Sequence, residues 1–384
     1  MNITFVNHAC YTIETEDHLI MFDPWFSGKV FNNSWALIKD TDINNLNLEK
    51  LKIICITHEH PDHLHWTTLK SIRKVTSQKI VVIIPQRKNK NVKSMIEKLG
   101  FAVLEIPPNR EMPLFAGFSV ANFPTGHDSA YVIRHKNRVL LNQNDCKLSQ
   151  QQCNLIKSLF PSIDYYLMQF SLAGFYANKD DKDSLLSAKL SHIEMIENEN
   201  YRKFFNPLTT IPFASFVYFC REENKFLNDY IVNLEELNED YQLVSYMDKI
   251  LLQDYKSRNL VNIDKWNKNI SNIQINKTPL VSQEDLLDSI TNFFKSSEFI
   301  NCPNSATFTF YDIDDSLTID YKNRRAFFNG SMKQSIAKVT SYDLQCFFKF
   351  PWGADTMNIT SCFEVYNSTE WKQNLIFKDR IYKR

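Results

Sequence analysis

Glycine is scarce in this sequence, with 7 residues in 384, and the net charge is zero because 44 basic residues balance 44 acidic ones. So few glycines leave no glycine-rich loop of the kind that holds nucleotide phosphates. The balanced charge gives no indication of a nucleic acid or a membrane surface as partner. No apolar run approaches the length of a membrane span, and no charged segment precedes a long apolar one, so we expect no signal peptide.

The eight cysteines are scattered, and none forms a Cys-x-x-Cys pair. Several of them, such as Cys55, Cys220 and Cys346, lie in apolar, strand-like segments. This pattern is typical of reduced thiols, and we therefore expect a cytoplasmic protein.

Potential metal ligands gather in one short segment. His58, His60, Asp62 and His63 lie within six residues and follow 52–56, an apolar, β-branched run that predicts a buried strand. Imidazole and carboxylate groups are good ligands for zinc, iron and manganese. A loop that leaves a strand end can turn these side chains toward one point. We predict that His58 and His60 face one metal, with Asp62 and His63 at a second metal beside it.

This segment resembles the HxHxDH motif of the metallo-β-lactamase superfamily, and the resemblance implies further site residues. Asp23 matches the aspartate that ends an early strand and supports the histidine loop. His127 matches the third histidine of the first metal, and Asp145 matches the carboxylate that bridges two metals. Asp62 and Asp145 are the expected catalytic carboxylates. The implied cofactor is one or two divalent ions of zinc, iron or manganese.

The superfamily's last ligand is usually a histidine that follows a late strand. We look for it near residues 210–216, where this chain has Ala214 and no histidine. The second metal is therefore expected to have only Asp62, His63 and Asp145, and to be the weaker one.

Several segments are similar to the CMP-N-acetylneuraminate hydroxylase family. Residues 23–35 resemble its DPW…G…F…W stretch, 56–64 its histidine loop, 141–146 its LN..DC element and 212–216 its PFA segment. That family also lacks the last histidine. It carries a Rieske iron–sulfur domain held by Cys-x-His and Cys-x-x-His ligands, and this chain does not contain that set of ligands.

Three functions stay open on these grounds. The first is metal-dependent hydrolysis of a small polar substrate, with sugars and nucleotide sugars as candidate classes. The second is oxygen chemistry at iron, which requires an external reductase as partner. The third is metal or ligand binding without catalysis. His8, Trp25, Asn32, Asn33 and Trp35 are candidates to line the substrate site, because aromatic faces and amide groups suit sugar rings and hydroxyls.

The expected fold is α/β: a metallo-β-lactamase-like αββα sandwich over residues 1–234, in which strands followed by helices occur twice. Within it, residues 66–74 are predicted to form a helix, 112–144 a β-meander and 209–219 one strand. Residues 235–384 are expected to form a helical linker and a smaller α+β C-terminal domain without catalytic groups. In that domain we predict a helix at 283–296, paired strands at 305–314 and 317–328, and two further strands at 343–350 and 357–366.

Overall fold

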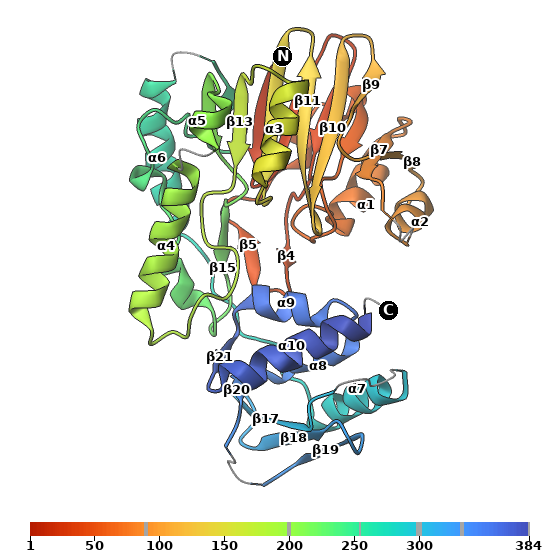
Figure 1. Ribbon diagram of the computed structural model, residues 1–384, viewed down its shortest axis with the longest axis vertical. Helices are drawn as coiled ribbons and strands as arrows, with labels where there is room; N and C mark the ends of the chain where they lie inside the picture. Colours follow the sequence, from red (N-terminus) through yellow and green to blue (C-terminus); the bar gives the residue numbers. More distant parts are fainter. Residues whose placement is uncertain (88–90, 198–200, 253–254, 297–301, 331–333, 383–384) are drawn as a thin grey trace.

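The computed structural model covers residues 1–384, and the structure is described for residues 1–87, 91–197, 201–252, 255–296, 302–330 and 334–382. Two large β-sheets form the upper part of the molecule in Figure 1, and a smaller unit built from the C-terminal residues lies below them. Among the described residues, no helix combines the length and the apolar character that crossing a membrane requires.

The first sheet is built mainly from the N-terminal third of the chain, with β16 added from a later segment, and has the order β16-β1-β2-β3-β6-β7-β8. Its N-terminal strands are antiparallel, and β3, β6, β7 and β8 run parallel. Its strands are β1 (Asn2–Asn7), β2 (Cys10–Glu14), β3 (Leu19–Phe22), β6 (Leu51–Cys55), β7 (Val81–Pro85), β8 (Ala102–Ile106) and β16 (Lys249–Ile250). The β-branched residues of β6 and β7 suit parallel strands that are covered on both faces.

The second sheet has the order β14-β13-β12-β11-β10-β9. Four strands form the antiparallel meander predicted between residues 112 and 144, and β13 and β14 add to it in parallel. These strands are β9 (Glu111–Phe115), β10 (Phe118–Thr125), β11 (Asp128–His135), β12 (Arg138–Asn144), β13 (Tyr165–Met168) and β14 (Thr209–Pro212).

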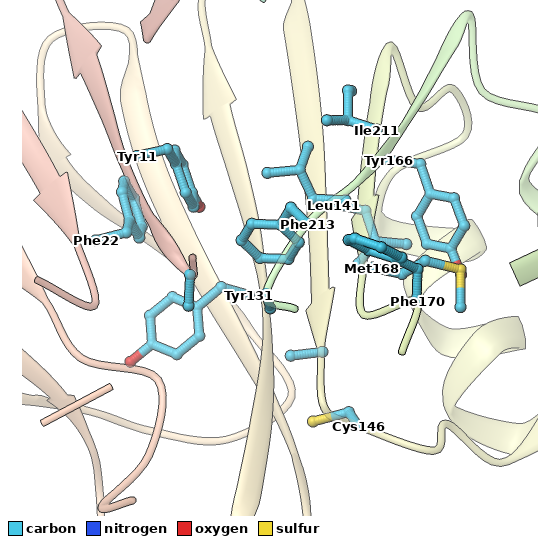
Figure 2. Packing of buried hydrophobic residues seen from close by; sticks show 14 of the residues in the cluster. Tyr11, Phe22, Tyr131, Leu141, Cys146, Tyr166, Met168, Phe170, Ile211 and Phe213 are labelled. Carbon is cyan, nitrogen blue, oxygen red and sulfur yellow. The ribbon is translucent and has the colours of Figure 1, made fainter. Parts of the chain in front are cut away.

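The main hydrophobic core lies between the two sheets. Figure 2 shows Tyr11 and Phe22 of the first sheet facing Tyr131 and Leu141 of the second. A second cluster covers the outer face of the first sheet, where α1 (Trp66–Val75) and α2 (Asn91–Lys98) pack. The outer face of the second sheet is covered by α3 (Gln150–Leu159), whose Cys153 and Ile156 belong to the main core. The protein therefore has the αββα sandwich that the sequence predicted.

A small sheet of β15-β5-β4 lies between the sandwich and the C-terminal unit (Figure 1). Its strands are β4 (Lys29–Val30), β5 (Trp35–Leu37) and β15 (Val217–Phe219). The strand predicted at 209–219 is thus two strands in different sheets. The break lies at Ala214, which has a φ of 56°, a left-handed conformation that no regular strand adopts.

The helical segment after β14 belongs to the sandwich rather than to a linker. α6 (Lys256–Ile270) contributes Trp266 to the main core, and β16 pairs with β1. The boundary predicted at residue 235 therefore falls inside the first core. A separate hydrophobic cluster begins only at Val281.

The C-terminal unit is a mixed sheet of order β19-β18-β17-β20-β21 with four helices. Its elements are α7 (Gln283–Ser296), β17 (Ser305–Phe310), β18 (Ser316–Asp320), β19 (Arg325–Phe328), β20 (Ala337–Val339), α8 (Ser341–Lys349), α9 (Gly353–Thr360), β21 (Phe363–Val365) and α10 (Ser368–Tyr382). The predicted helix at 283–296 is confirmed, and the strand predicted at 305–314 pairs as expected with the segment after it. The strand predicted at 317–328 is instead two antiparallel strands, β18 and β19.

Two strand predictions in this unit are wrong. Residues 343–350 lie in α8, and 357–366 contain the end of α9 and only the short β21. The side chain of Thr340 caps α8 by accepting a hydrogen bond from the Asp343 backbone N–H. This cap satisfies a donor that would otherwise lack a partner and starts a helix in an apolar segment whose composition suits a strand equally well.

Candidate metal centre

The histidine loop leaves the carboxyl end of β6 and is held from below by Asp23. The backbone N–H of Thr57 donates to Asp23 Oδ1 at 2.7 Å, and the Thr57 hydroxyl donates to Oδ2 at 2.6 Å. The loop then turns tightly, because the backbone N–H groups of His63 and Leu64 both donate to the carbonyl of His60. The turn brings alternate side chains of the loop to the same end of the sandwich.

His58, His60 and Asp145 form a first group of potential metal ligands, with one ligand atom of each lying within 4.8 Å of the others. His58 Nε2 and His60 Nδ1 face each other at 2.9 Å, and His58 Nε2 lies 3.7 Å from Asp145 Oδ2. Asp145 follows β12, so this group joins the first sheet to the second.

His8, Asp62 and His63 form a second group with the same spacing, and all three are buried. Asp62 Oδ2 lies 3.1 Å from His8 Nε2 and 3.3 Å from His63 Nε2. The two groups meet at Asp145, whose Oδ2 is also 3.3 Å from His63 Nε2. Asp145 is therefore placed between them, as a carboxylate that bridges two ions has to be.

These distances fit a metal-binding arrangement. Two nitrogens held by one tetrahedral zinc ion at roughly 2.0–2.1 Å lie about 3.3 Å from each other. The ligand-atom distances in the two groups, from 2.9 Å to 3.7 Å, surround this value.

Buried polar atoms without hydrogen-bond partners also indicate a metal site. Within the described residues, His63 Nε2, Asp62 Oδ1 and Asp128 Oδ1 are buried and have no hydrogen-bond partner. Buried polar atoms are rarely left unpaired, because the loss of water contacts destabilises the fold. A divalent cation between these atoms would satisfy them, so the residues present fit such an ion.

The electrostatic environment differs between the two groups. Burial, reinforced by the neighbouring His63 and His60, lowers the pKa of His58 well below its usual value. A neutral imidazole is the form that binds a metal. Burial also opposes protonation of His63, but the carboxylates of Asp62 and Asp145 outweigh it and raise the pKa of that histidine. The two carboxylates therefore favour positive charge at the position of His63.

His127 is in neither group, although it was the predicted third histidine of the first metal. Its side chain is exposed at the tip of the β10–β11 hairpin, where Gly126 and His127 form a two-residue turn. The next residue, Asp128, is back in the strand ladder, opposite Thr125. Its Oδ1 lies 3.7 Å from His58 Nε2. Asp128, rather than His127, therefore lies beside the first group.

The second group includes His8, which was not predicted from the sequence to be a metal ligand. The segment where a last histidine was expected contains Ala214, and its backbone N–H donates to the carbonyl of His8 at 2.9 Å. This bond fixes the β1–β2 turn, where His8 has a φ of 44° and directs its ring toward Asp62. The second group is therefore more complete than predicted.

Asp23 is fully buried and has the position of a support beneath the ligands. Its Oδ2 accepts from His63 Nδ1 at 3.0 Å and from Asn144 Nδ2 at 3.2 Å. The bond to Nδ1 leaves Nε2 of His63 directed at Asp62 and Asp145. The sequence singled out Asp23 for this role, but it gave no indication that Thr57 and Asn144 share the network.

The predicted substrate-lining residues are engaged elsewhere. Trp25 and Trp35 are 1% and 4% exposed and belong to the core. The side chain of Asn32 donates to Asp343 and that of Asn33 to the Tyr342 hydroxyl, both in the C-terminal unit. A hollow of about 330 Å³ borders His58 instead, lined in part by the charged side chains of Glu59, Arg87 and Glu105. The rest of its lining is apolar and includes Ile56, Leu64 and Ile84.

Comparisons with known proteins agree with this architecture. Residues 2–144 match the family described as "Beta-lactamase superfamily domain". The cytidine monophosphate-N-acetylneuraminic acid hydroxylase of Mus musculus is 37% identical over 73 residues, which are 19% of this chain and 13% of that protein. A protein of Mycobacterium tuberculosis named as a Rieske 2Fe-2S iron–sulfur protein is 24% identical over 246 residues, which are 60% of this chain and 46% of that one.

Among solved structures, the diiron β-hydroxylase CmlA from Streptomyces venezuelae is similar at 15% identity with a TM-score of 0.42. The match covers 72% of this chain and 52% of CmlA. The chain spans less than half the length of the curated relatives above, so their activities are not transferred with the similarity. Residues 2–144, which contain the histidine loop, are therefore similar to the metallo-β-lactamase superfamily domain.

Proposed function

We propose that the protein is a metal-dependent hydrolase that acts on a small polar molecule, with sugars and nucleotide sugars as candidate classes. One observation carries the proposal: two groups of ligand atoms meet at one carboxylate, Asp145. Paired metal sites of this kind are typical of enzymes that cleave phosphate and carboxylate derivatives.

In this proposal His58, His60 and Asp128 hold one ion, and His8, Asp62 and His63 hold the other. A divalent ion in such a site lowers the pKa of bound water and polarises a carbonyl or phosphoryl oxygen. Asp145 contributes to both positions. The equal share of imidazole and carboxylate ligands suits zinc, iron and manganese alike.

The chain's own groups provide orientation and proton transfer. His8 contacts Asp62 Oδ2 at 3.1 Å and so orients the Asp62 carboxylate in the site. Asp23 and Asn144 keep His63 in one orientation. Because His58 and His63 are buried, the reacting atoms would lie at the bottom of the site, where electrostatic interactions are stronger than in water.

A second candidate function is iron-dependent oxygen chemistry. It is favoured by the 73 residues that are 37% identical to a hydroxylase and by the carboxylates at both positions. Since the chain does not contain the ligands of a Rieske cluster, this function would require an external reductase.

Metal analysis and activity measurements on the same preparation separate the two. The hydrolase proposal predicts cleavage of a phosphodiester, ester or lactone from a panel with zinc or manganese bound and without oxygen. Asp145→Asn should abolish this activity. Asp164→Asn is the matched control, because Asp164 is a buried carboxylate that pairs with Arg138 rather than with the site. Oxygen consumption that requires iron and a reductant, with no hydrolysis, would overturn the proposal.

A further inference from the structure

We propose that the first turn of α8, in the C-terminal unit, positions His60 through the turn that joins β4 to β5. The inference rests on the proposed metal site, because His60 is one of its candidate ligands. Asp343 and Asn32 are then positioning residues for the first ion. The C-terminal unit, predicted to carry no catalytic groups, would in this way set the affinity of a site in the sandwich.

The turn between β4 and β5 has an unusual backbone. Phe31, Asn32 and Asn33 are consecutive, and all three have positive φ angles, of 49°, 54° and 57°. Residues other than glycine rarely adopt this left-handed conformation, and asparagine tolerates it better than phenylalanine does. Such a turn persists only where the surrounding structure holds it.

Contacts from the C-terminal unit hold this turn. The Asn32 side chain donates to Asp343 Oδ1 at 3.1 Å, and the Asn33 side chain donates to the Tyr342 hydroxyl at 3.3 Å. Both acceptors lie in the first turn of α8. The turn is therefore tied to α8 by two successive side chains.

An ion pair with Arg221 holds Asp343, the acceptor of the Asn32 hydrogen bond, in place. Arg221 Nη1 lies 2.8 Å from Asp343 Oδ2 and donates to Asp343 Oδ1 at 3.0 Å. Both side chains are 1% exposed. Arg221 Nη1 also donates to the backbone carbonyl of Asn32 at 3.4 Å. A buried charge without its partner is strongly unfavourable, so this pair locks Asp343 in place.

The other end of the turn reaches the metal site. The Phe31 ring is buried and lies edge-on to the His60 ring, with 6.1 Å between the centroids. It is supported from behind by Trp35, at 4.9 Å. His60 in turn lies edge-on to His58, at 4.6 Å. Because Phe31 occupies one side of the His60 ring, a shift of the turn would allow His60 to rotate away from His58.

Among the described residues, no hydrogen bond, ion pair or ring contact joins the second group of ligands to this turn. His63 is held by Asp23 and His8 by the Ala214 backbone, so their orientation has a different origin. The inference therefore makes an asymmetric prediction. Loosening the turn should weaken one ion and leave the other unchanged, whereas general destabilisation would weaken both.

The test is a titration of metal-free protein with Co²⁺, followed through its visible absorption, and then with Zn²⁺ in competition. Phe31→Ala and Asn32→Gly should each weaken one of two ions about 10-fold, the usual size of an effect transmitted through a ligand's supporting group. Phe31→Tyr should retain the native affinity for both ions, because an aromatic ring still lies against His60. Asn32→Gly removes the side-chain bond without placing strain on the left-handed backbone and without leaving Arg221 unpaired.

Asn206→Gly is the matched control, because Asn206 is also left-handed, with a φ of 48°, but ends α5 (Arg202–Phe205). It should leave both affinities unchanged. Native affinity for both ions in Phe31→Ala and Asn32→Gly would overturn the inference and leave the metal site intact. Equal weakening of both ions would also overturn it. A native protein that binds neither Co²⁺ nor Zn²⁺ would overturn the proposed function and this inference together.

Discussion

Replacement of Asp23 by asparagine should weaken metal binding while the fold is retained. The Asp23 carboxylate accepts four hydrogen bonds, from the Thr57 backbone and hydroxyl, His63 Nδ1 and Asn144 Nδ2. Asparagine has the same shape but provides one acceptor oxygen and one NH₂ group. In either orientation of the amide, its NH₂ group faces a hydrogen-bond donor that had an Asp23 oxygen as its acceptor in the native protein.

The geometry predicts the size of two losses, one in folding stability and one in metal affinity. If the amide oxygen takes the Oδ2 position, three bonds are kept without their charge, and the Thr57 backbone N–H loses its acceptor. A buried donor without an acceptor destabilises a protein by about 1–3 kcal/mol. The hydrogen bond to His63 also weakens, and loss of such a supporting partner usually lowers metal affinity about 10–100-fold, or about 1.4–2.7 kcal/mol.

The assay is competition for Zn²⁺ against a chromophoric chelator, together with denaturant unfolding of the metal-free protein. Asp164→Asn is the control, because Asp164 accepts from the Val139 backbone and pairs with Arg138 at the far end of β12, about 20 Å from Asn144. The control should lose stability and keep its metal affinity. If Asp23→Asn binds metal as tightly as the native protein, Asp23 does not support the ligands.

Three further predictions concern the second metal, pH and packing. His8→Ala should remove one of two bound ions, as measured by metal analysis, whereas His127→Ala should remove none; the reverse would restore His127 as a ligand. Burial lowers the pKa of Lys378 to about 8, from 10.5 when exposed. Between these two pKa values the unfolded state binds more protons than the folded state, so the free energy of unfolding should rise with pH. Lys378→Met should therefore stabilise the protein by about 2–3 kcal/mol near pH 7, measured by guanidinium unfolding. A gain in stability that does not fade by about pH 10.5 would contradict this prediction. Gly353→Ala should destabilise by about 1–3 kcal/mol in the same assay, because its Cβ would lie 2.6 Å from an α8 backbone carbon, whereas Gly174→Ala, with 3.6 Å available, should be tolerated.

Secondary-structure elements that depend on a short sequence pattern could be predicted from the sequence. The strand predicted at 52–56, the histidine loop after it and the helix predicted at 66–74 follow from β-branched runs, turn residues and helical spacing within about 25 residues. The meander between residues 112 and 144 was predicted on the same grounds. Where the local pattern was ambiguous, as in the apolar segments that became α8 and α9, strand and helix could not be separated without the cap at Thr340.

Contacts between distant segments decided the rest of the site. His8 lies 54 residues from Asp62, and its place beside it depends on the bond between its carbonyl and Ala214, a residue of the late β14–β15 connection. Nothing in the immediate neighbourhood of His8 encodes that bond. In the same way, Asn32 looks like a polar group available to a substrate until Asp343, 311 residues later, is seen to occupy it.

The sequence by itself therefore determined that a loop of potential metal ligands follows β6, because the ligands are close together in the chain. The role of Asp23 beneath that loop was implied by the resemblance to the metallo-β-lactamase superfamily. Only the tertiary structure decided which side chain of 127–128 turns inward, because a two-residue hairpin turn directs one of them outward and returns the next to the ladder. It also decided that the C-terminal unit begins near Val281, since a core boundary depends on which distant surfaces are buried together.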